Sequence, residues 1–241
     1  MRKLRLATLS LVVVGAATVS YADVNFEQIT FQQAIEKAKR TDQFVMIDFY
    51  TDWCVPCKEL DRHIFKDTTI GRFINQRFIA VKINAEKEDG LVLMQKYQLI
   101  KAYPTVLLLN SEGKEIDRIV GLFGKEDYFQ TLRDYAEGEN TFSALLSQLE
   151  NDEDNPELWF KVAKKYKDRG NSQKAVEYFE KASSYEPYVN DVILWWSLGG
   201  SYYGLSEFEK AAKAIRKAIQ LEPDNPYLKK FLDKLETELN K

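Results

Sequence analysis

The C-terminal part of the chain repeats its own pattern at an offset of 36 residues. Trp159 recurs as Trp195, and Pro187 recurs as Pro223. The positions between them also agree: Tyr166, Ala175, Phe179 and Ala182 in the first copy match Tyr202, Ala211, Ile215 and Ala218 in the second. A period of this length indicates a pair of helices that buries its apolar face by stacking on its neighbour. This part of the chain is therefore predicted to be all-α.

The repeats also predict where the helical elements lie. We expect one helix pair at residues 156–189 and another at 192–225, with a capping helix completing residues 156–241, because the end of a stacked array needs a polar outer face. Residues 138–155 should form a connecting helix and then an acidic linker at 151–155. The connecting helix is indicated by an apolar stripe at helical spacing: Phe142, Leu145, Leu146 and Leu149.

The N-terminal half alternates between helical and strand-like patterns. Residues 44–50 are apolar except for Asp48, which is typical of a strand covered on both faces of a parallel or mixed sheet. Residues 111–114 read as a hairpin turn between two further strands. We predict helices at 31–40, 58–65, 91–97 and 125–136 and strands at 44–50, 78–84, 105–109 and 115–120. Residues 23–137 should therefore form an α/β domain with a central sheet flanked by helices.

The only two cysteines, Cys54 and Cys57, lie between the first predicted strand and the next helix. A thiol at a helix N-terminus is favoured as the thiolate by free N–H groups and the helix dipole. Cys54 is thus predicted to be the nucleophile, and Cys57, one turn on and more protected, the resolving thiol. Trp53 offers an aromatic surface beside the reactive sulfur. Pro56 suits the first helical turn, where its missing N–H costs nothing.

A structural disulfide and a zinc site are the two alternatives to a redox role for the cysteines. A static disulfide would stabilise the fold little, because it closes a very short loop. A zinc ion would need four ligands, and His63 is the single histidine that could join the thiols. We expect neither a metal nor a cofactor, and we expect His63 to lie on a helix surface.

Residues 47–58, Ile-Asp-Phe-Tyr-Thr-Asp-Trp-Cys-Val-Pro-Cys-Lys, resemble the thioredoxin superfamily. They are most similar to the C-terminal thioredoxin-like domain of bacterial thiol:disulfide interchange proteins, and the resemblance covers residues 24–137. It implies a thioredoxin fold with a mixed sheet and a cis Pro104 opposite the cysteines. It also implies that Asp48 relays a proton to the resolving cysteine, with Lys82 nearby. Burial would raise the pKa of Asp48 and suit it to acid–base work near neutral pH. The alternatives are a purely structural Asp48 and an ordinary trans Pro104.

The residues between the cysteines leave the redox direction open. Val55-Pro56 is neither the Gly-Pro of cytosolic thioredoxins nor the Pro-His of strongly oxidising periplasmic enzymes. The interchange proteins also carry a membrane electron carrier to which this sequence has no matching segment. We therefore expect a separate upstream thiol–disulfide carrier to supply electrons.

The repeats resemble tetratricopeptide repeats, in which the inner helices face a groove. Residues one position on from the repeated signature are then candidates for binding a peptide or partner. The alternative is that their side chains pack on the α/β domain or on the connecting helix. The candidates are Phe160, Lys164, Trp196 and Tyr203.

The N-terminal 22 residues have the layout of a secretory signal peptide. Arg2, Lys3 and Arg5 precede an apolar stretch, and Ser20-Tyr21-Ala22 places small residues at the two positions that a signal peptidase inspects. This predicts export to the periplasm or cell envelope. An uncleaved membrane anchor is the alternative, and it is the one way in which we expect the chain to meet a membrane. The 34 basic and 37 acidic residues form no long run of one sign, which argues against a nucleic-acid partner.

Two functional hypotheses follow. The first is an exported thiol–disulfide oxidoreductase that reduces client proteins in the envelope while its repeats bind the client or a partner. The second is a repeat scaffold or chaperone with a redox-linked docking domain. A disulfide isomerase is a third possibility.

Overall fold

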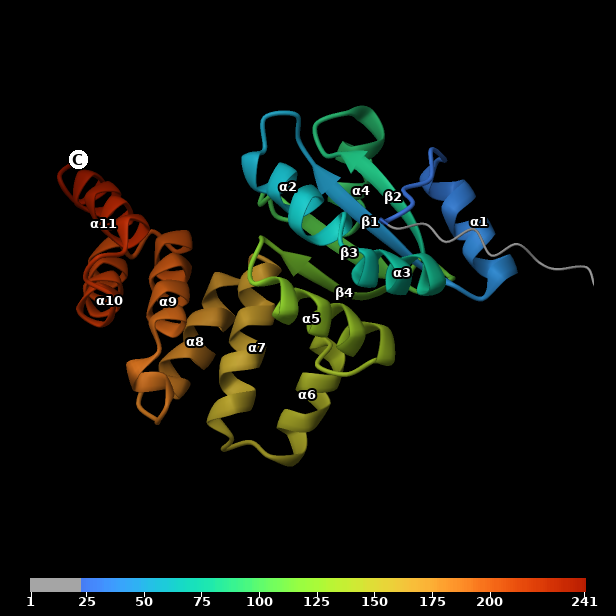
Figure 1. Ribbon diagram of the computed structural model, residues 1–241. Coiled ribbons are helices and arrows are strands. Elements are labelled where there is room, and N and C mark those ends of the chain that lie inside the picture. Colours follow the sequence, from blue (N-terminus) through green and yellow to red (C-terminus); the bar gives the residue numbers. More distant parts are fainter. Residues whose placement is uncertain (1–22) are drawn as a thin grey trace, which may run out of the picture.

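The computed structural model describes residues 23–241, so the signal peptide predicted at residues 1–22 lies outside the described residues. An α/β region comes first, and pairs of helices extend from one side of it (Figure 1). None of the helices within residues 23–241 combines the length and the apolarity that crossing a bilayer requires.

The α/β region is built on a four-stranded mixed sheet. The strands are β1 (Phe44–Tyr50), β2 (Phe78–Asn84), β3 (Thr105–Leu109) and β4 (Glu115–Val120), in the order β2-β1-β3-β4. β1 runs parallel to β2 and antiparallel to β3, and β3 pairs antiparallel with β4. The apolar β1 and β3 occupy the middle of the sheet, where both faces are covered. The α/β fold with a mixed sheet is confirmed.

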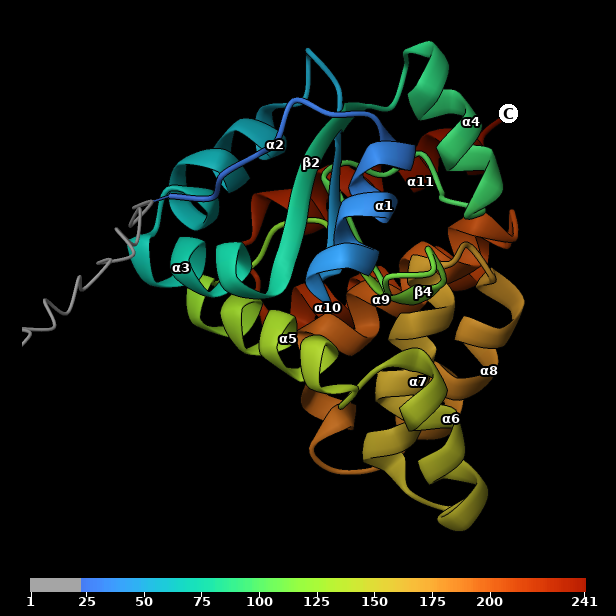
Figure 2. The same cartoon turned by 90° about the vertical axis from the view of Figure 1, so that its right-hand side faces the viewer.

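Helices cover both faces of the sheet. α1 (Phe31–Thr41) and α4 (Glu88–Lys96) pack on one face, and α2 (Val55–Leu60), α3 (Thr68–Arg77) and α5 (Lys125–Glu137) pack on the other (Figure 2). Successive side chains of a strand point to opposite faces. Val45 and Ile47 therefore join the core under α1, whereas Met46 joins the core under α2. Asp48 shares the face of Met46, beneath the helix that carries the cysteines.

Three features of this region differ from the sequence prediction. The helix predicted at 91–97 is α4, which begins at Glu88. The helix predicted at 58–65 begins at Val55, and its last turn is a π-helix, η1 (Asp61–Phe65). The helix α3 was not predicted at all. Its β-branched residues and internal glycine give it low intrinsic helix propensity. It forms because Asp67 caps its N-terminus through the N–H groups of Thr69 and Ile70, and because Ile70 and Ile74 enter the core.

The remaining helices form the predicted all-α region. They are α6 (Phe142–Asn151), α7 (Pro156–Asp168), α8 (Ser172–Ala182), α9 (Val192–Gly204), α10 (Phe208–Leu221) and α11 (Pro226–Leu239), with a short 3-10 turn η2 (Tyr188–Asn190). The repeated tryptophans play the same part twice. Trp159 donates its indole N–H to the carbonyl of Glu153 at 2.8 Å, and Trp195 donates to that of Val189 at 2.9 Å. The sequence repeat is thus a repeat of side-chain hydrogen bonding as well as of packing.

The connecting helix α6 is part of the helical core. Leu145 and Leu149 lie in the same buried cluster as Trp159 and Phe179. Its N-terminus is capped by Thr141, which accepts from the N–H of Ala144 at 3.2 Å. The helical region follows α5 after a short turn, and its helix α7 contacts the edge strand β4.

Candidate redox site

The two cysteines lie at the start of α2, just beyond the end of β1. They form a disulfide in the structure. Cys54 is the N-cap residue, and its Sγ accepts a hydrogen bond from the backbone N–H of Cys57 at 3.1 Å. Pro56 occupies the first turn, where it removes no helical hydrogen bond. The backbone N–H of Cys57 therefore points toward Cys54 Sγ, and it would stabilise a thiolate there together with the helix dipole.

Burial does not distinguish the two cysteines. Cys54 is 2% exposed and Cys57 is 4% exposed, so the expectation that Cys57 is the more protected residue is wrong for this disulfide form. The reason is that the bond holds both sulfurs within one helical turn. What sets Cys54 apart is its N-cap position, since its sulfur is the one that receives a backbone N–H.

Trp53 stands beside the disulfide and is held from two directions. It is 65% exposed, yet its indole N–H lies 3.1 Å from both carboxylate oxygens of Glu86. Its ring meets that of Tyr103 edge to face, with centroids 6.1 Å apart. The Tyr103–Pro104 peptide bond is cis, as the resemblance implies. Glu86 was missed by sequence reasoning, because nothing local marks a surface glutamate 33 residues from its partner.

Asp48 and Lys82 meet beneath α2 because β1 and β2 pair in parallel with these residues in register. The Lys82 ammonium lies 2.7 Å from Asp48 Oδ2, as a charge partner without aligned hydrogen-bond geometry. The Asp48 side chain is fully buried. Burial raises its pKa from 3.8 to about 6, although Lys82 opposes this shift. The carboxyl group therefore changes protonation near neutral pH.

Asp61, on η1, extends this pair to the surface. Its carboxylate also contacts the Lys82 ammonium, and its side chain is 43% exposed. Burial acts to lower the pKa of Lys82, but the two aspartates outweigh it, and the pKa is raised. The rings of Phe26 and Phe65 lie 4.7 and 5.3 Å from the ammonium and add cation–π attraction. Sequence analysis missed Asp61, because the π turn that aims it at Lys82 leaves no clear pattern.

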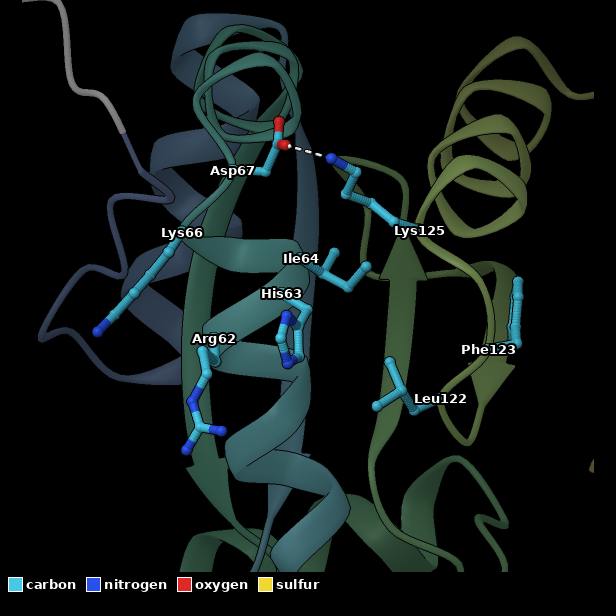
Figure 3. A pocket seen from close by; sticks show the side chains of 8 residues that line it. All are labelled: Arg62, His63, Ile64, Lys66, Asp67, Leu122, Phe123 and Lys125. Carbon is cyan, nitrogen blue, oxygen red and sulfur yellow. Dashed lines mark hydrogen bonds and ion pairs between the residues drawn. The ribbon is translucent and has the colours of Figure 1, made fainter.

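A cavity of about 580 Å³ lies between η1 and the chain entering α5. Figure 3 shows Arg62 and His63 on η1 and Phe123 on the opposite wall. Glu59 contacts both the Arg62 guanidinium at 3.0 Å and the His63 ring at 3.0 Å. The His63 side chain is 60% exposed, in agreement with its predicted place on a helix surface. Within residues 23–241, no cluster of three or more histidine, cysteine, aspartate or glutamate side chains is placed to hold a metal ion.

The predicted partner-binding residues lie on α7 and α9. Phe160 stacks on Tyr188 with centroids 4.9 Å apart, and the Lys164 ammonium lies 5.6 Å from the Phe160 ring. Trp196 and Tyr203 both contact Phe231 of α11, at 5.3 and 5.6 Å. These aromatic contacts are therefore made with neighbouring helices of the repeat region.

Part of this helical surface remains open to solvent. Trp196 is still 39% exposed and lines a cavity of about 350 Å³. The same cavity is lined by Ile193 and Tyr227, which are also exposed and which sequence analysis did not single out.

Comparison with known proteins agrees with this architecture. Residues 31–136 match the thioredoxin-like domain family, and residues 156–188 and 192–225 each match a tetratricopeptide repeat. The thiol:disulfide interchange protein DsbD of Pasteurella multocida is 32% identical over 113 residues, which are 45% of this chain and 19% of that protein. DsbD of Salmonella typhimurium is 29% identical over 120 residues, which are 47% of this chain and 21% of that protein. The chain thus spans about a fifth of the length of these curated relatives.

Among solved structures, a protein from Bacteroides thetaiotaomicron that is assigned as a disulphide isomerase is 33% identical. The match covers 49% of this chain and 98% of that chain, with a TM-score of 0.45. The family match at residues 31–136 includes both Cys54 and Cys57. Residues 31–136 are therefore a thioredoxin-like domain similar to disulfide oxidoreductases, and residues 156–188 and 192–225 are tetratricopeptide repeats.

Proposed function

We propose that the protein is a thiol–disulfide oxidoreductase of the bacterial cell envelope that reduces disulfides in client proteins. The observation that carries the proposal is the arrangement around one helix N-terminus. The cysteine pair begins α2, the buried Asp48–Lys82 pair lies beneath it, and Tyr103, which precedes Pro104, contacts Trp53. A structural disulfide would need none of these neighbours.

In the reduced protein, the Cys54 thiolate attacks one sulfur of a client disulfide. A bond forms between Cys54 and that sulfur, and the other client sulfur leaves as a thiolate. The Cys57 thiolate then attacks Cys54 Sγ, which forms the intramolecular disulfide and releases the second client thiolate. Two electrons pass from the cysteine pair to the client. An upstream dithiol carrier of the same chemistry returns the pair to its reduced form.

Asp48 supports the second step. The resolving thiol must lose a proton before it attacks, and a carboxyl group with a pKa of about 6 can accept one near neutral pH. Lys82 and Asp61 connect that carboxyl group to the surface, where the proton can leave. On the solvent-exposed side of the disulfide, Trp53 and Pro104 border the surface on which the client chain binds.

The equilibrium between the cysteine pair and dithiothreitol tests this function. Titration with defined ratios of reduced and oxidised dithiothreitol, followed by tryptophan fluorescence, yields the reduction potential of the pair. We expect a reduction potential of about −270 mV, which is typical of a reductant. A Trp53→Phe variant identifies the signal, because three other tryptophans contribute to the fluorescence. A potential near about −120 mV would reverse the direction, and no reversible transition would reject the redox function.

The repeats are proposed to hold the client or a partner protein. The supporting observation is the exposed apolar group formed by Ile193, Trp196 and Tyr227 beside a cavity. The same surface would serve the second candidate function, in which the protein is a scaffold whose redox domain only docks. An oxidoreductase loses its action on clients when Cys54 is removed, whereas a scaffold keeps it.

Replacing Asp48 with asparagine should stabilise the fold and impair the reaction together. Because burial raises the pKa of Asp48 above its unfolded value, the ionised carboxylate destabilises the native state by up to about 3 kcal/mol. The stability that the neutral carboxyl provides is complete below pH 4 and is lost as the pH rises through about 6. Asp48→Asn should therefore unfold at higher urea concentration at pH 7.5 and at a concentration closer to wild type at pH 4.

The same variant should resolve mixed disulfides about 10- to 100-fold more slowly, since its amide cannot accept the proton of Cys57. Urea unfolding at the two pH values and single-turnover reduction of a client protein measure the two effects. A variant that is stabilised but reacts at the wild-type rate would show that Asp48 has no part in the proton transfer.

A further inference from the structure

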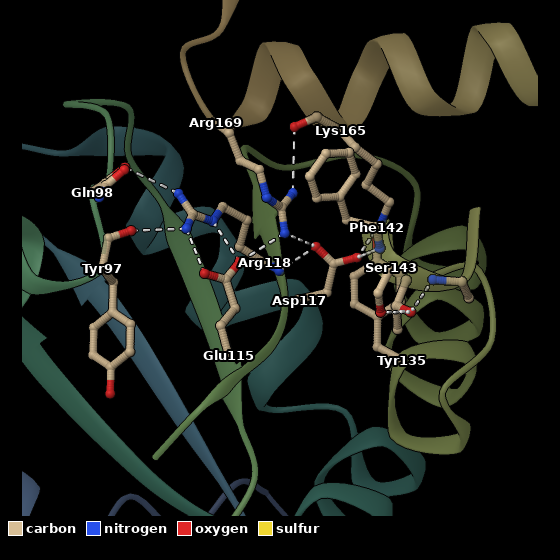
Figure 4. A network of polar contacts seen from close by, with 12 residues as sticks. Tyr97, Gln98, Glu115, Asp117, Arg118, Tyr135, Phe142, Ser143, Lys165 and Arg169 are labelled. Carbon is tan, nitrogen blue, oxygen red and sulfur yellow. Dashed lines mark hydrogen bonds and ion pairs between the residues drawn. The ribbon is translucent and has the colours of Figure 1, made fainter. Parts of the chain in front are cut away.

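A group of buried charges joins the first repeat to the edge of the sheet (Figure 4). At its centre is Asp117 of β4, whose side chain is inaccessible to solvent. Arg169, just after α7, donates from Nη2 to Asp117 Oδ1 at 2.8 Å, and Lys165 of α7 contacts Oδ2. The backbone N–H of Phe142 also donates to Oδ2 at 2.8 Å. The Asp117 carboxylate thus links the edge strand β4 to the N-terminus of α6 and to α7.

A second set of contacts in this group connects Arg169 to the loop that precedes the redox site. Arg169 Nη2 also donates to Glu115 Oε1 at 2.8 Å, and Glu115 in turn accepts from the guanidinium of Arg118. Arg118 is almost fully buried and donates to two backbone carbonyl groups, that of Tyr97 at 2.9 Å and that of Gln98 at 3.3 Å. These carbonyl groups begin the loop at 97–104.

The same loop contacts the turn that follows α7. Gly170 lies so close to Ile100 that a Cβ atom built on it would stand 2.6 Å from Ile100 Cγ2. This is inside van der Waals contact, so the backbone of the repeat packs directly on that side chain. The repeat therefore reaches the loop in two ways. It packs directly on Ile100, and it is linked indirectly to the start of the loop because Arg169 and Arg118 both bind Glu115.

The loop ends at the redox site. Tyr103 and the cis Pro104 complete it, and the Tyr103 ring meets Trp53, the neighbour of Cys54. The Pro104 carbonyl accepts the N–H of Gly121 at 2.8 Å and so continues the pairing of β3 with β4. A continuous series of contacts thus runs from Arg169 and Gly170 to the place where a client would approach Cys54.

These contacts also resist separation of the two regions. Moving α7 away from β4 would leave Asp117 without its cationic partners while other groups still bury it, and unpaired buried charge is strongly unfavourable. These contacts therefore favour a single orientation of the repeat region against the sheet.

We propose that the first repeat is a positioning element of the redox site. Gly170 and Arg169, acting through Ile100 and Arg118, hold the loop at 97–104 where Tyr103 and Pro104 receive the client chain. This inference rests on the proposed oxidoreductase function and adds the repeat to its machinery. Ile100, Arg118, Arg169 and Gly170 are then positioning residues, distant from the sulfur chemistry itself.

The test uses the full chain and a matched pair of glycine variants. Gly170→Ala pushes a methyl group against Ile100, whereas Gly138→Ala meets no atom within 4 Å. Both glycines have positive φ, 73° and 79°, so both variants carry similar backbone strain. Kinetics with insulin as the disulfide substrate should show a KM raised about 5- to 50-fold by Gly170→Ala and unchanged by Gly138→Ala. The potential measured against dithiothreitol should stay at the wild-type value in both.

Ile100→Ala supplies a second variant that leaves the repeat intact. It opens a gap between the turn and the loop, and we expect KM to rise in the same direction. The double variant Gly170→Ala with Ile100→Ala should return to within about twofold of wild type, because the added methyl group fills the gap. Such coupling would not arise from destabilisation of the repeat alone.

The two proposals fail separately. Equal KM values for Gly170→Ala and Gly138→Ala, or additive effects in the double variant, would overturn the positioning role. A wild-type protein with no reversible redox transition against dithiothreitol would overturn the oxidoreductase function itself.

Discussion

Replacing Cys54 with serine should abolish client reduction, with a loss of about 10³-fold or more in the rate of insulin reduction. Serine keeps the size and the N-cap hydrogen bonding of the side chain, but its hydroxyl group is a poor nucleophile toward a disulfide at neutral pH. The fold should survive, because a disulfide across so short a loop contributes little stability. The rate of reduction and the urea unfolding midpoint together measure both expectations.

Cys57→Ser is the matched variant. It keeps the attacking thiol but cannot resolve the intermediate, so it should accumulate a mixed disulfide with clients that non-reducing electrophoresis detects. The double serine variant should form none. If Cys57→Ser were inert and Cys54→Ser trapped clients instead, the two roles would have to be exchanged. If Cys54→Ser retained the full effect of the wild-type protein on its client, the scaffold function would replace the proposed enzyme function.

Replacing Asp117 with alanine should cost about 3–5 kcal/mol in the free energy of unfolding. The variant leaves Lys165 largely buried without its counter-ion and removes one of the two carboxylates that pair with Arg169. It also removes the acceptor for the N–H of Phe142. Urea unfolding of the full chain, followed by circular dichroism, measures the effect.

Two controls separate a buried pair from an ordinary one. Glu177→Ala breaks an exposed pair with Lys174, 2.8 Å long, and should change stability by less than about 1 kcal/mol. Asp117→Leu combined with Lys165→Met replaces the buried pair with apolar side chains and should recover much of the loss. An Asp117→Ala variant within about 1 kcal/mol of wild type would show that the interface is hydrated in solution and not closed.

Much of the fold could be read from short-range patterns. The all-α repeats follow from apolar positions that recur at a fixed offset, and each helix pair then has one way to bury them. β1 is apolar on both faces and therefore occupies the centre of the sheet. The cysteine pair lies at a strand–helix junction, a position that local sequence signals mark well. These features depend on residues that are close to one another in the sequence, so a sequence pattern is enough to predict them.

What escaped prediction depends on residues that are distant in sequence. α3 is helical because its isoleucines reach the core, against its own weak propensity. Asp61 and Glu86 gain their parts only when η1 meets Lys82 and when the chain after β2 meets Trp53. The similar burial of the two cysteines is likewise a property of the closed disulfide and its surroundings.

The sequence by itself determined the two kinds of architecture and the place of the cysteine pair at a helix start, because periodicity and helix-start signals are local. Only the tertiary structure decided how the two parts are joined. Asp117, Arg118 and Arg169 look like surface charges in the sequence, at positions that no motif marks. They become a buried network because β4 is an edge strand and α7 packs across it. Each charge buried there needs an oppositely charged partner, since an unpaired one would destabilise the folded state.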